Sequence, residues 1–139
     1  DSAIEFFLSL PVANCGGKER SEINTQYINL EFNANGALLA MFGYNRHDRQ
    51  PLSLRELDMI NLRTHINTER WCARLAIPES LLDKLFHCGH LKLGMVFSFN
   101  CYKISEDPQI EHYASAFPVA SDKPDFHRPE SFGTALLEE

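Results

Sequence analysis

Apolar and polar residues alternate along much of the chain with the two-residue period of β-strands. The clearest example covers residues 26–33, where Ile28, Leu30 and Phe32 share one face and polar side chains share the other. Further strands are predicted over residues 3–10, 37–42, 68–77, 91–102, 111–117 and 134–137. Many strands joined by short turns favour an all-β fold, a mostly antiparallel β-sandwich.

Turn and capping signals separate these strands. The Asn-Gly pair at residues 35–36 predicts a tight hairpin, because both residues tolerate a positive φ. Residues 53–56 (Ser-Leu-Arg-Glu) have the form of a capping box, so a short helix is expected over residues 53–60. A second helix is expected after Pro78, with Gly89 as its C-terminal stop. The β-sandwich therefore carries one or two short helices.

Size and charge limit the classes of function. The chain has 139 residues, of which 44% are hydrophobic, so we expect a single globular domain over residues 1–139. Its net charge of −6, without a compensating stripe of Lys and Arg, argues against nucleic acid as a partner. No apolar run is long enough for a membrane-spanning helix.

Four widely spaced cysteines, Cys15, Cys72, Cys88 and Cys101, form no C-x-x-C pair. Free thiols and one disulfide both remain open, so the cysteines do not fix the redox compartment. The His-Cys-Gly-His run at residues 87–90 lacks a second pair of ligands at zinc-site spacing. The sequence therefore predicts no metal site.

The last third of the chain carries a series of recognisable motifs. Residues 99–103 read Phe-Asn-Cys-Tyr-Lys, residues 111–113 Glu-His-Tyr, and residues 124–130 Pro-Asp-Phe-His-Arg-Pro-Glu, followed by Phe132-Gly133. This series resembles the close of bacterial carbohydrate-binding modules of the family 9-like group. Asp1-Ser2 with Glu5-Phe6-Phe7, and the strand at residues 27–33 with Gly36, also resemble the strands of that group.

The resemblance implies a DOMON-like β-sandwich with an oligo- or polysaccharide as ligand. It also implies a bacterial protein that is secreted, periplasmic or on the cell surface and linked to polysaccharide breakdown. Related modules contain calcium, but no loop here has the sequence of a calcium site, so we expect no cofactor and leave calcium as the alternative. Members of the group carry further strands before the Asp-Ser segment, and the chain begins without Met. We therefore expect that N-terminal strands are missing and that exposed sheet edges favour a homodimer.

Sugar-binding sites combine an aromatic surface with side chains that hydrogen-bond hydroxyl groups. The polar face of strand 26–33 offers such side chains, and two further predicted strands would add to it if they lie in the same sheet. Glu31 and Arg74 would then form an ion pair. The candidate carbohydrate-binding residues are Asn29, Glu31, Asn33, Arg46, Trp71, Arg74, Asn100, Tyr102 and His127.

Several of these residues also have a simpler, structural explanation. The polar strand face is also what a half-exposed sheet presents to solvent. Trp71 alternates with Ala73, Leu75 and Ile77, a pattern more typical of a core residue than of a stacking platform. His127 is expected to hydrogen-bond the backbone and fix the proline-rich segment across the sheet.

Three functional hypotheses follow. We favour a non-catalytic carbohydrate-binding domain. The alternatives are a structural or assembly β-sandwich that has lost its ligand, and a glycan-active enzyme or subunit that uses Glu31 and a second acid. Glu5 and Glu31 are expected on neighbouring strands, but pairing with arginine explains them more simply than catalysis does. No Ser-His-Asp order or phosphate-binding loop is present.

Overall fold

A large antiparallel sheet forms the centre of the computed structural model, which describes residues 2–12 and 25–138. The strand order is β4-β3-β2-β1-β7-β8, and β9 pairs with β7 beside β8. The strands are β1 (Ser2–Ser9), β2 (Tyr27–Asn33), β3 (Leu38–Gly43), β4 (Arg49–Pro51), β7 (Val96–Ser105), β8 (His112–Ser115) and β9 (Gly133–Leu136). Thus β1 and β2 occupy central positions in the sheet.

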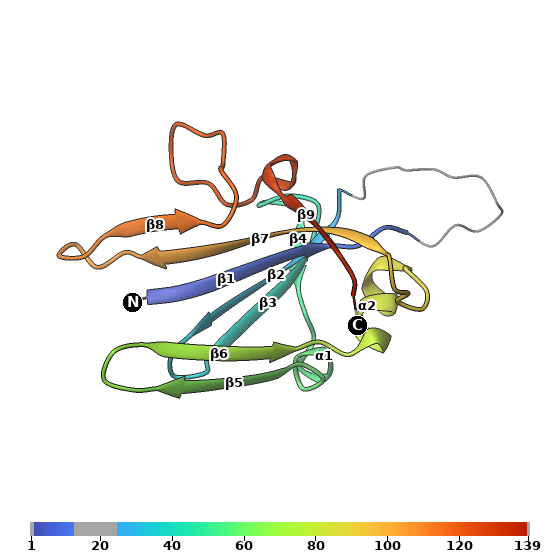
Figure 1. The fold of residues 1–139 in the computed structure, drawn as a ribbon, viewed down its shortest axis with the longest axis horizontal. Helices are drawn as coiled ribbons and strands as arrows, with labels where there is room; N and C mark the ends of the chain where they lie inside the picture. The colour runs from blue at the N-terminus through green and yellow to red at the C-terminus, as the bar shows by residue number, and fades with distance from the viewer. Residues whose placement is uncertain (1, 13–24, 139) are drawn as a thin grey trace.

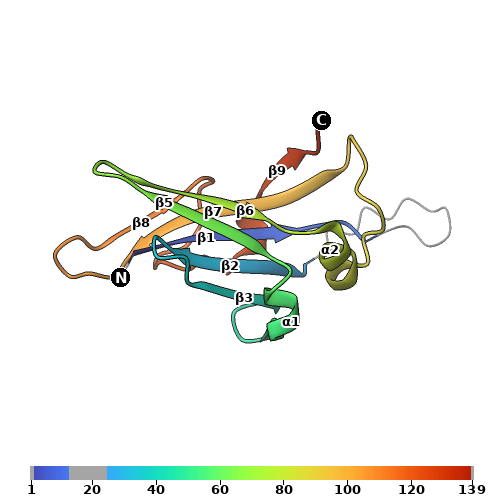
Figure 2. The same ribbon diagram turned by 90° about the horizontal axis from the view of Figure 1, so that it is seen from below.

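A smaller layer covers one face of this sheet. It consists of the hairpin of β5 (Asn61–Ile66) and β6 (Trp71–Ala76) together with α1 (Leu54–Leu57) and α2 (Glu79–Phe86). Figure 1 shows the hairpin and α2 on one side of the large sheet and the segment after β8 on the other. Seen from below, the hairpin crosses in front of β1 and β2 (Figure 2). The two layers make the predicted β-sandwich.

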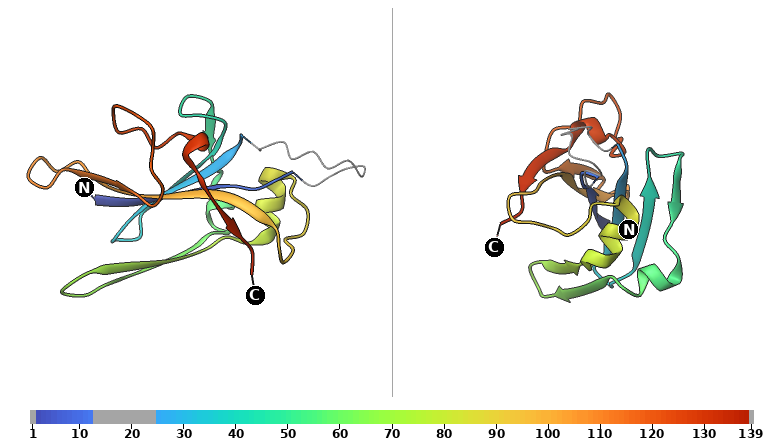
Figure 3. Two further views of the ribbon diagram at one scale, coloured as in Figure 1. Left: turned by 45° about the horizontal axis from the view of Figure 1, so that its top comes forward. Right: turned by 90° about the vertical axis from the view of Figure 1, so that its right-hand side faces the viewer.

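Strand alternation gives the large sheet two different hydrophobic clusters. Toward the hairpin, Leu8, Ile28 and Leu30 pack with Leu81 and Phe86 of α2. The opposite face carries a smaller aromatic cluster of Phe7, Tyr27, Tyr102 and Phe126. Residues 117–132, with the short 3-10 helix η1 (Pro129–Ser131), cover this second face (Figure 3). Both faces of β1 and β2 are therefore covered along part of their length.

Local signals were largely confirmed in the turns and helices. Ser53 caps α1 through a full capping box with Glu56, as predicted. The predicted hairpin joins β2 and β3, and within its Asn-Gly pair Gly36 takes the positive φ, of 83°. The helix α2 ends at Phe86, and His87 takes the left-handed conformation there in place of Gly89. Within the described residues, neither helix is long or apolar enough to cross a lipid bilayer.

Long-range pairing differs from the sequence-based expectation in three places. The predicted strand at residues 68–77 becomes β6, which pairs with β5 and does not join the large sheet. Strands β4 and β5 were not predicted. The strand expected from residue 91 begins at Val96.

Cys72, Cys88 and Cys101 are free thiols, and Cys15 lies outside the described residues.

Candidate functional site

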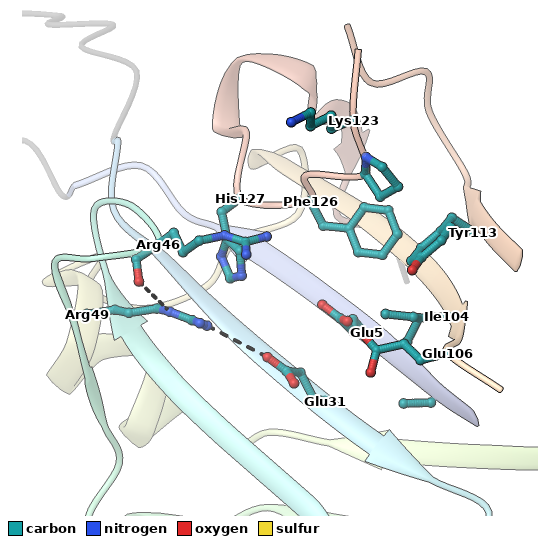
Figure 4. Close-up of a pocket in the computed structure, with 12 residues that line it drawn as sticks. Glu5, Glu31, Arg46, Arg49, Ile104, Glu106, Tyr113, Lys123, Phe126 and His127 are labelled. Carbon is teal, nitrogen blue, oxygen red and sulfur yellow. Dashed lines mark hydrogen bonds and ion pairs between the residues drawn. The ribbon is translucent and has the colours of Figure 1, made fainter. Parts of the chain in front are cut away.

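A cavity of about 610 Å³ lies over the polar face of β1 and β2. Arginine side chains and His127 line one side of it, and Tyr113 and Ile104 line the other (Figure 4). The complete lining consists of Ala3, Glu5, Glu31, Arg46, Arg49, Ile104, Glu106, Tyr113, Lys123, Pro124, Phe126 and His127. The cavity is thus enclosed by strands far apart in sequence and by the C-terminal segment.

Two carboxylates form part of the strand side of the cavity. Glu5 of β1 lies directly opposite Glu31 of β2 in the antiparallel register. Glu5 is 7% exposed, and burial, followed by the charge of Glu31, raises its pKa to about 7. The positions of both residues follow from strand alternation, which places Glu5 on the face opposite Ile4 and Phe6. Glu5 therefore takes up protons near neutral pH.

Arg49 connects the cavity wall to the sheet. Its Nη1 donates to the Oδ1 of buried Asn29 at 2.8 Å and lies 3.7 Å from the Oε1 of Glu31. The Nδ2 of Asn29 in turn donates to the Oε1 of Glu31 at 2.9 Å. Arg49 Nε donates to the carbonyl oxygen of Arg46 at 3.2 Å (Figure 4). These contacts fix the loop before β4 against β2.

The C-terminal segment supplies the roof of the cavity. Asn100, which is fully buried, donates to the carbonyl oxygens of Phe117 and Ser131 at 3.1 and 3.2 Å and accepts from Phe117 N at 3.1 Å. Phe126 stacks on Tyr102 with ring centroids 4.1 Å apart. The Nη2 of Arg46 meets Asp125 Oδ1 at 3.3 Å. Polar anchors and aromatic packing together hold the segment over the sheet.

His127 joins this segment to β2. Its Nδ1 shares a hydrogen bond of 3.0 Å with the hydroxyl of Tyr27, and Phe7 contacts the ring edge-on at 5.0 Å. The partner is a side chain, so the expectation that the ring bonds to backbone is wrong. Burial, and then the charges of Arg49 and Arg46, lower the pKa of His127 to about 4. The ring is therefore neutral at physiological pH.

Four of the sequence-predicted residues lie at the cavity. Glu31, Arg46 and His127 line it, and Asn29 lies beneath it as a partner of Glu31. Asn33 is on the same strand face, but its Oδ1 accepts from the backbone N–H groups of the β2–β3 turn. Asn33 therefore belongs to the turn.

The other predicted residues lie elsewhere. Asn100 and Tyr102 are on the predicted face, but both are buried beneath residues 117–132 and act in anchoring that segment. Arg74 lies on the outer side of the β5–β6 hairpin, opposite Arg63, so the expected Glu31–Arg74 pair is wrong and Arg49 takes that place. Trp71 packs edge-on against Phe32 at 6.5 Å, in the core below the sheet.

Several lining residues were not among the candidates. Glu5 and Arg49 could have been included, because Glu5 is the one charged residue in an apolar strand and Arg49 belongs to a cationic loop. Tyr113 and Phe126 belong to the motifs at residues 111–113 and 124–130, but nothing in those motifs shows that they meet at a cavity, because their places depend on the β7–β8 pairing and on the path of residues 117–132. Long-range contacts alone bring these aromatic side chains to the cavity.

A metal ion has no evident site in the described part of the chain. Over residues 2–12 and 25–138, no three His, Cys, Asp or Glu side chains come together in a way that could hold one. Of the His-Cys-Gly-His run, Cys88 is buried in the core, whereas His90 pairs with Glu79 at 2.8 Å.

The chain is similar in fold and in sequence to known proteins. Its fold matches a solved structure from Bacteroides uniformis ATCC 8492, named as a proposed carbohydrate-binding protein, with a TM-score of 0.72 and 27% sequence identity. The match covers 99% of this chain but 62% of that protein, so the chain spans less than two thirds of its neighbour. No curated protein compared with the chain matches it. The family described as "Carbohydrate-binding family 9" matches residues 1–137, and the chain belongs to that family.

Proposed function

We propose that the cavity binds one or more sugar residues of an oligo- or polysaccharide and does not cleave them. The observation that carries this proposal is the division of the cavity into two kinds of wall. Tyr113 and Phe126 offer aromatic surface on one side, and Glu31 and the two arginines offer hydrogen-bonding groups on the other (Figure 4). A pyranose has the same division, because its ring hydrogens form an apolar face and its hydroxyls form a polar rim.

Size and rigidity support the same proposal. A cavity of about 610 Å³ falls within the range of about 300–1,000 Å³ typical of small-ligand sites. Arg49 is held by Asn29 and by the carbonyl oxygen of Arg46 before any ligand arrives. Arg46 is likewise held by Asp125. Donors that are already in place lower the entropic cost of binding.

The arrangement of the carboxylates supports binding over hydrolysis. Glycosidases place two carboxyl groups on opposite sides of the scissile bond. Glu5 and Glu31 instead rise side by side from neighbouring strands of one sheet face. Glu31 is also engaged by Arg49 and Asn29, which disfavours a role as nucleophile or base. A glycan-active subunit is therefore the weaker hypothesis.

We further propose that the domain belongs to a bacterial protein that is secreted, periplasmic or on the cell surface and takes part in polysaccharide breakdown. Family membership and the Bacteroides neighbour support this assignment. The net charge of −6 supports a partner other than nucleic acid. Binding is proposed to need no cofactor, and a homodimer through exposed sheet edges remains a prediction.

Isothermal titration calorimetry of the full chain against plant and host oligosaccharides tests the proposal. The matched variants are Glu31→Gln in the cavity and Glu69→Gln, an exposed residue of the β5–β6 turn outside the lining. We expect a saccharide that binds the wild type and E69Q equally but E31Q at least about tenfold more weakly, a loss of about 1.4 kcal/mol. Absence of binding across the panel would favour the assembly domain that has lost its ligand.

A further inference from the structure

We propose that the cavity selects a sugar with a free amino group, whose ammonium is held by Glu5 and Glu31. This inference rests on the proposed function and specifies its ligand class. Its basis is Glu5, which lines the cavity although only 7% of its surface is exposed. Among the described residues, Glu5 has no hydrogen-bond donor or ion-pair partner for its carboxyl group. A buried polar group without a partner indicates a missing ligand more strongly than an exposed one does.

The charges around Glu5 are unevenly distributed. Glu31 lies opposite it on β2, and Glu106 lies near it at the end of β7 (Figure 4). The cations line the other side of the cavity, where both arginines already have partners. Their charges lower the pKa of Glu5 by less than burial and Glu31 raise it. Lys123 is exposed and comes from the roof (Figure 4). The β1 side of the cavity therefore carries an excess of carboxylate.

An ammonium group fits this excess better than a hydroxyl does. It carries three donors and a positive charge, so it can satisfy Glu5 and Glu31 with charge-assisted hydrogen bonds. A hydroxyl leaves the negative charge of a buried carboxylate uncompensated, which costs free energy. An N-acetylated amine has lost its charge and keeps one N–H donor. The site should therefore distinguish a free amine from its acetylated counterpart.

The protonation of Glu5 supports the same preference. Burial and the charge of Glu31 raise the pKa of Glu5 to about 7, so a share of the free protein holds a proton there at neutral pH. A bound ammonium would stabilise the ionised carboxylate and expel that proton. Neutral sugars give no such stabilisation. A sugar amine itself takes up protons when it binds as an ammonium near neutral pH, so the proton lost by Glu5 is measured as the difference between wild type and Glu5→Gln.

Calorimetry with chitosan oligosaccharides, chitin oligosaccharides and cello-oligosaccharides of equal length separates the outcomes. At pH 6.5 we expect the free amine to bind wild type at least about tenfold more tightly than the acetylated and neutral sugars. Glu5→Gln should reduce this preference to within about twofold, whereas Glu69→Gln should keep it. Titrations of the amine in two buffers of different ionisation enthalpy should show that wild type takes up fewer protons, or releases more, than E5Q, because only wild type loses the proton of Glu5.

Two results would overturn the inference in different ways. Equal binding of the three sugar classes by wild type would remove the amine preference but leave carbohydrate binding in place. Binding of none of them, nor of any saccharide in the wider panel, would remove both proposals. A preference for the amine that E5Q retains in full would show that Glu5 does not select it.

Discussion

Glu5 and Glu31 lie opposite each other on β1 and β2, and Arg49 is 3.7 Å from Glu31 while Glu5 has no such partner among the described residues. Like charges directly across two strands destabilise a sheet. The pair therefore lowers the free energy of unfolding, and a bound ligand that compensates the negative charge would raise it again. Under the proposed function, the relationship between these two residues would link stability to binding.

The first prediction concerns stability against pH. Because the pKa of Glu5 is about 7 in the folded protein and 4.5 ordinarily, the unfolded chain loses this proton first as pH rises. The stability contribution of Glu5 is thus complete below pH 4.5 and is lost between pH 4.5 and 7. Relative to wild type, Glu5→Gln should gain about 3 kcal/mol of unfolding free energy across that window. Urea unfolding at several pH values measures it, and parallel curves for the two proteins would contradict it.

The second prediction concerns the aromatic wall. Tyr113 is 39% exposed and lines the cavity, so replacing it with Ala should leave the fold intact and remove apolar contact with the sugar. We expect a loss of about 1–2 kcal/mol in binding free energy, measured by calorimetry. Tyr44→Ala is the matched control, because Tyr44 is 49% exposed but is not part of the lining. Equal losses in both variants would place the ligand elsewhere.

The third prediction concerns the anchor of the roof. Asn100→Ala removes the side-chain hydrogen bonds to Phe117 and Ser131 and leaves their partly buried backbone groups without these partners. Unfolding free energy should fall by about 2–4 kcal/mol, and protease should cut residues 117–132 faster. Asn61→Ala, on the exposed face of the hairpin, should change neither property. Unaltered proteolysis of N100A would show that the segment is held by other contacts.

The fourth prediction uses the only tryptophan of the chain. Trp71 packs against Phe32 in the cluster on the face opposite the cavity. Its fluorescence emission should therefore stay constant when sugar saturates the protein, with calorimetry on the same sample confirming saturation. A blue shift or quenching of Trp71 would indicate a site on the hairpin side of the sheet.

The parts of the fold that sequence could predict are those that depend on neighbouring residues. Alternation placed Glu31 on one face of β2 and Leu30 on the other, because side-chain direction reverses at each residue of a strand. The capping box at Ser53 could also be predicted, because its two partners, Ser53 and Glu56, lie only three residues apart. Such features need no knowledge of distant pairing.

The composition of the site depended on distant pairing. Arg74 and Arg49 are both cations near predicted strands, and sheet membership decides which of them reaches Glu31. Asn100 and Tyr102 have the predicted orientation, but the cover of residues 117–132 turns a binding surface into a buried one. Strand alternation alone predicts neither which arginine reaches Glu31 nor the burial of Asn100 and Tyr102.

The most direct test of carbohydrate binding at this cavity is a crystal structure of the chain with a bound oligosaccharide. We expect one sugar ring in the cavity over β1 and β2, with an apolar face toward Tyr113 or Phe126 and polar groups toward Glu5 and Glu31. A sugar bound instead on the outer face of the β5–β6 hairpin, with the cavity filled by solvent, would contradict it.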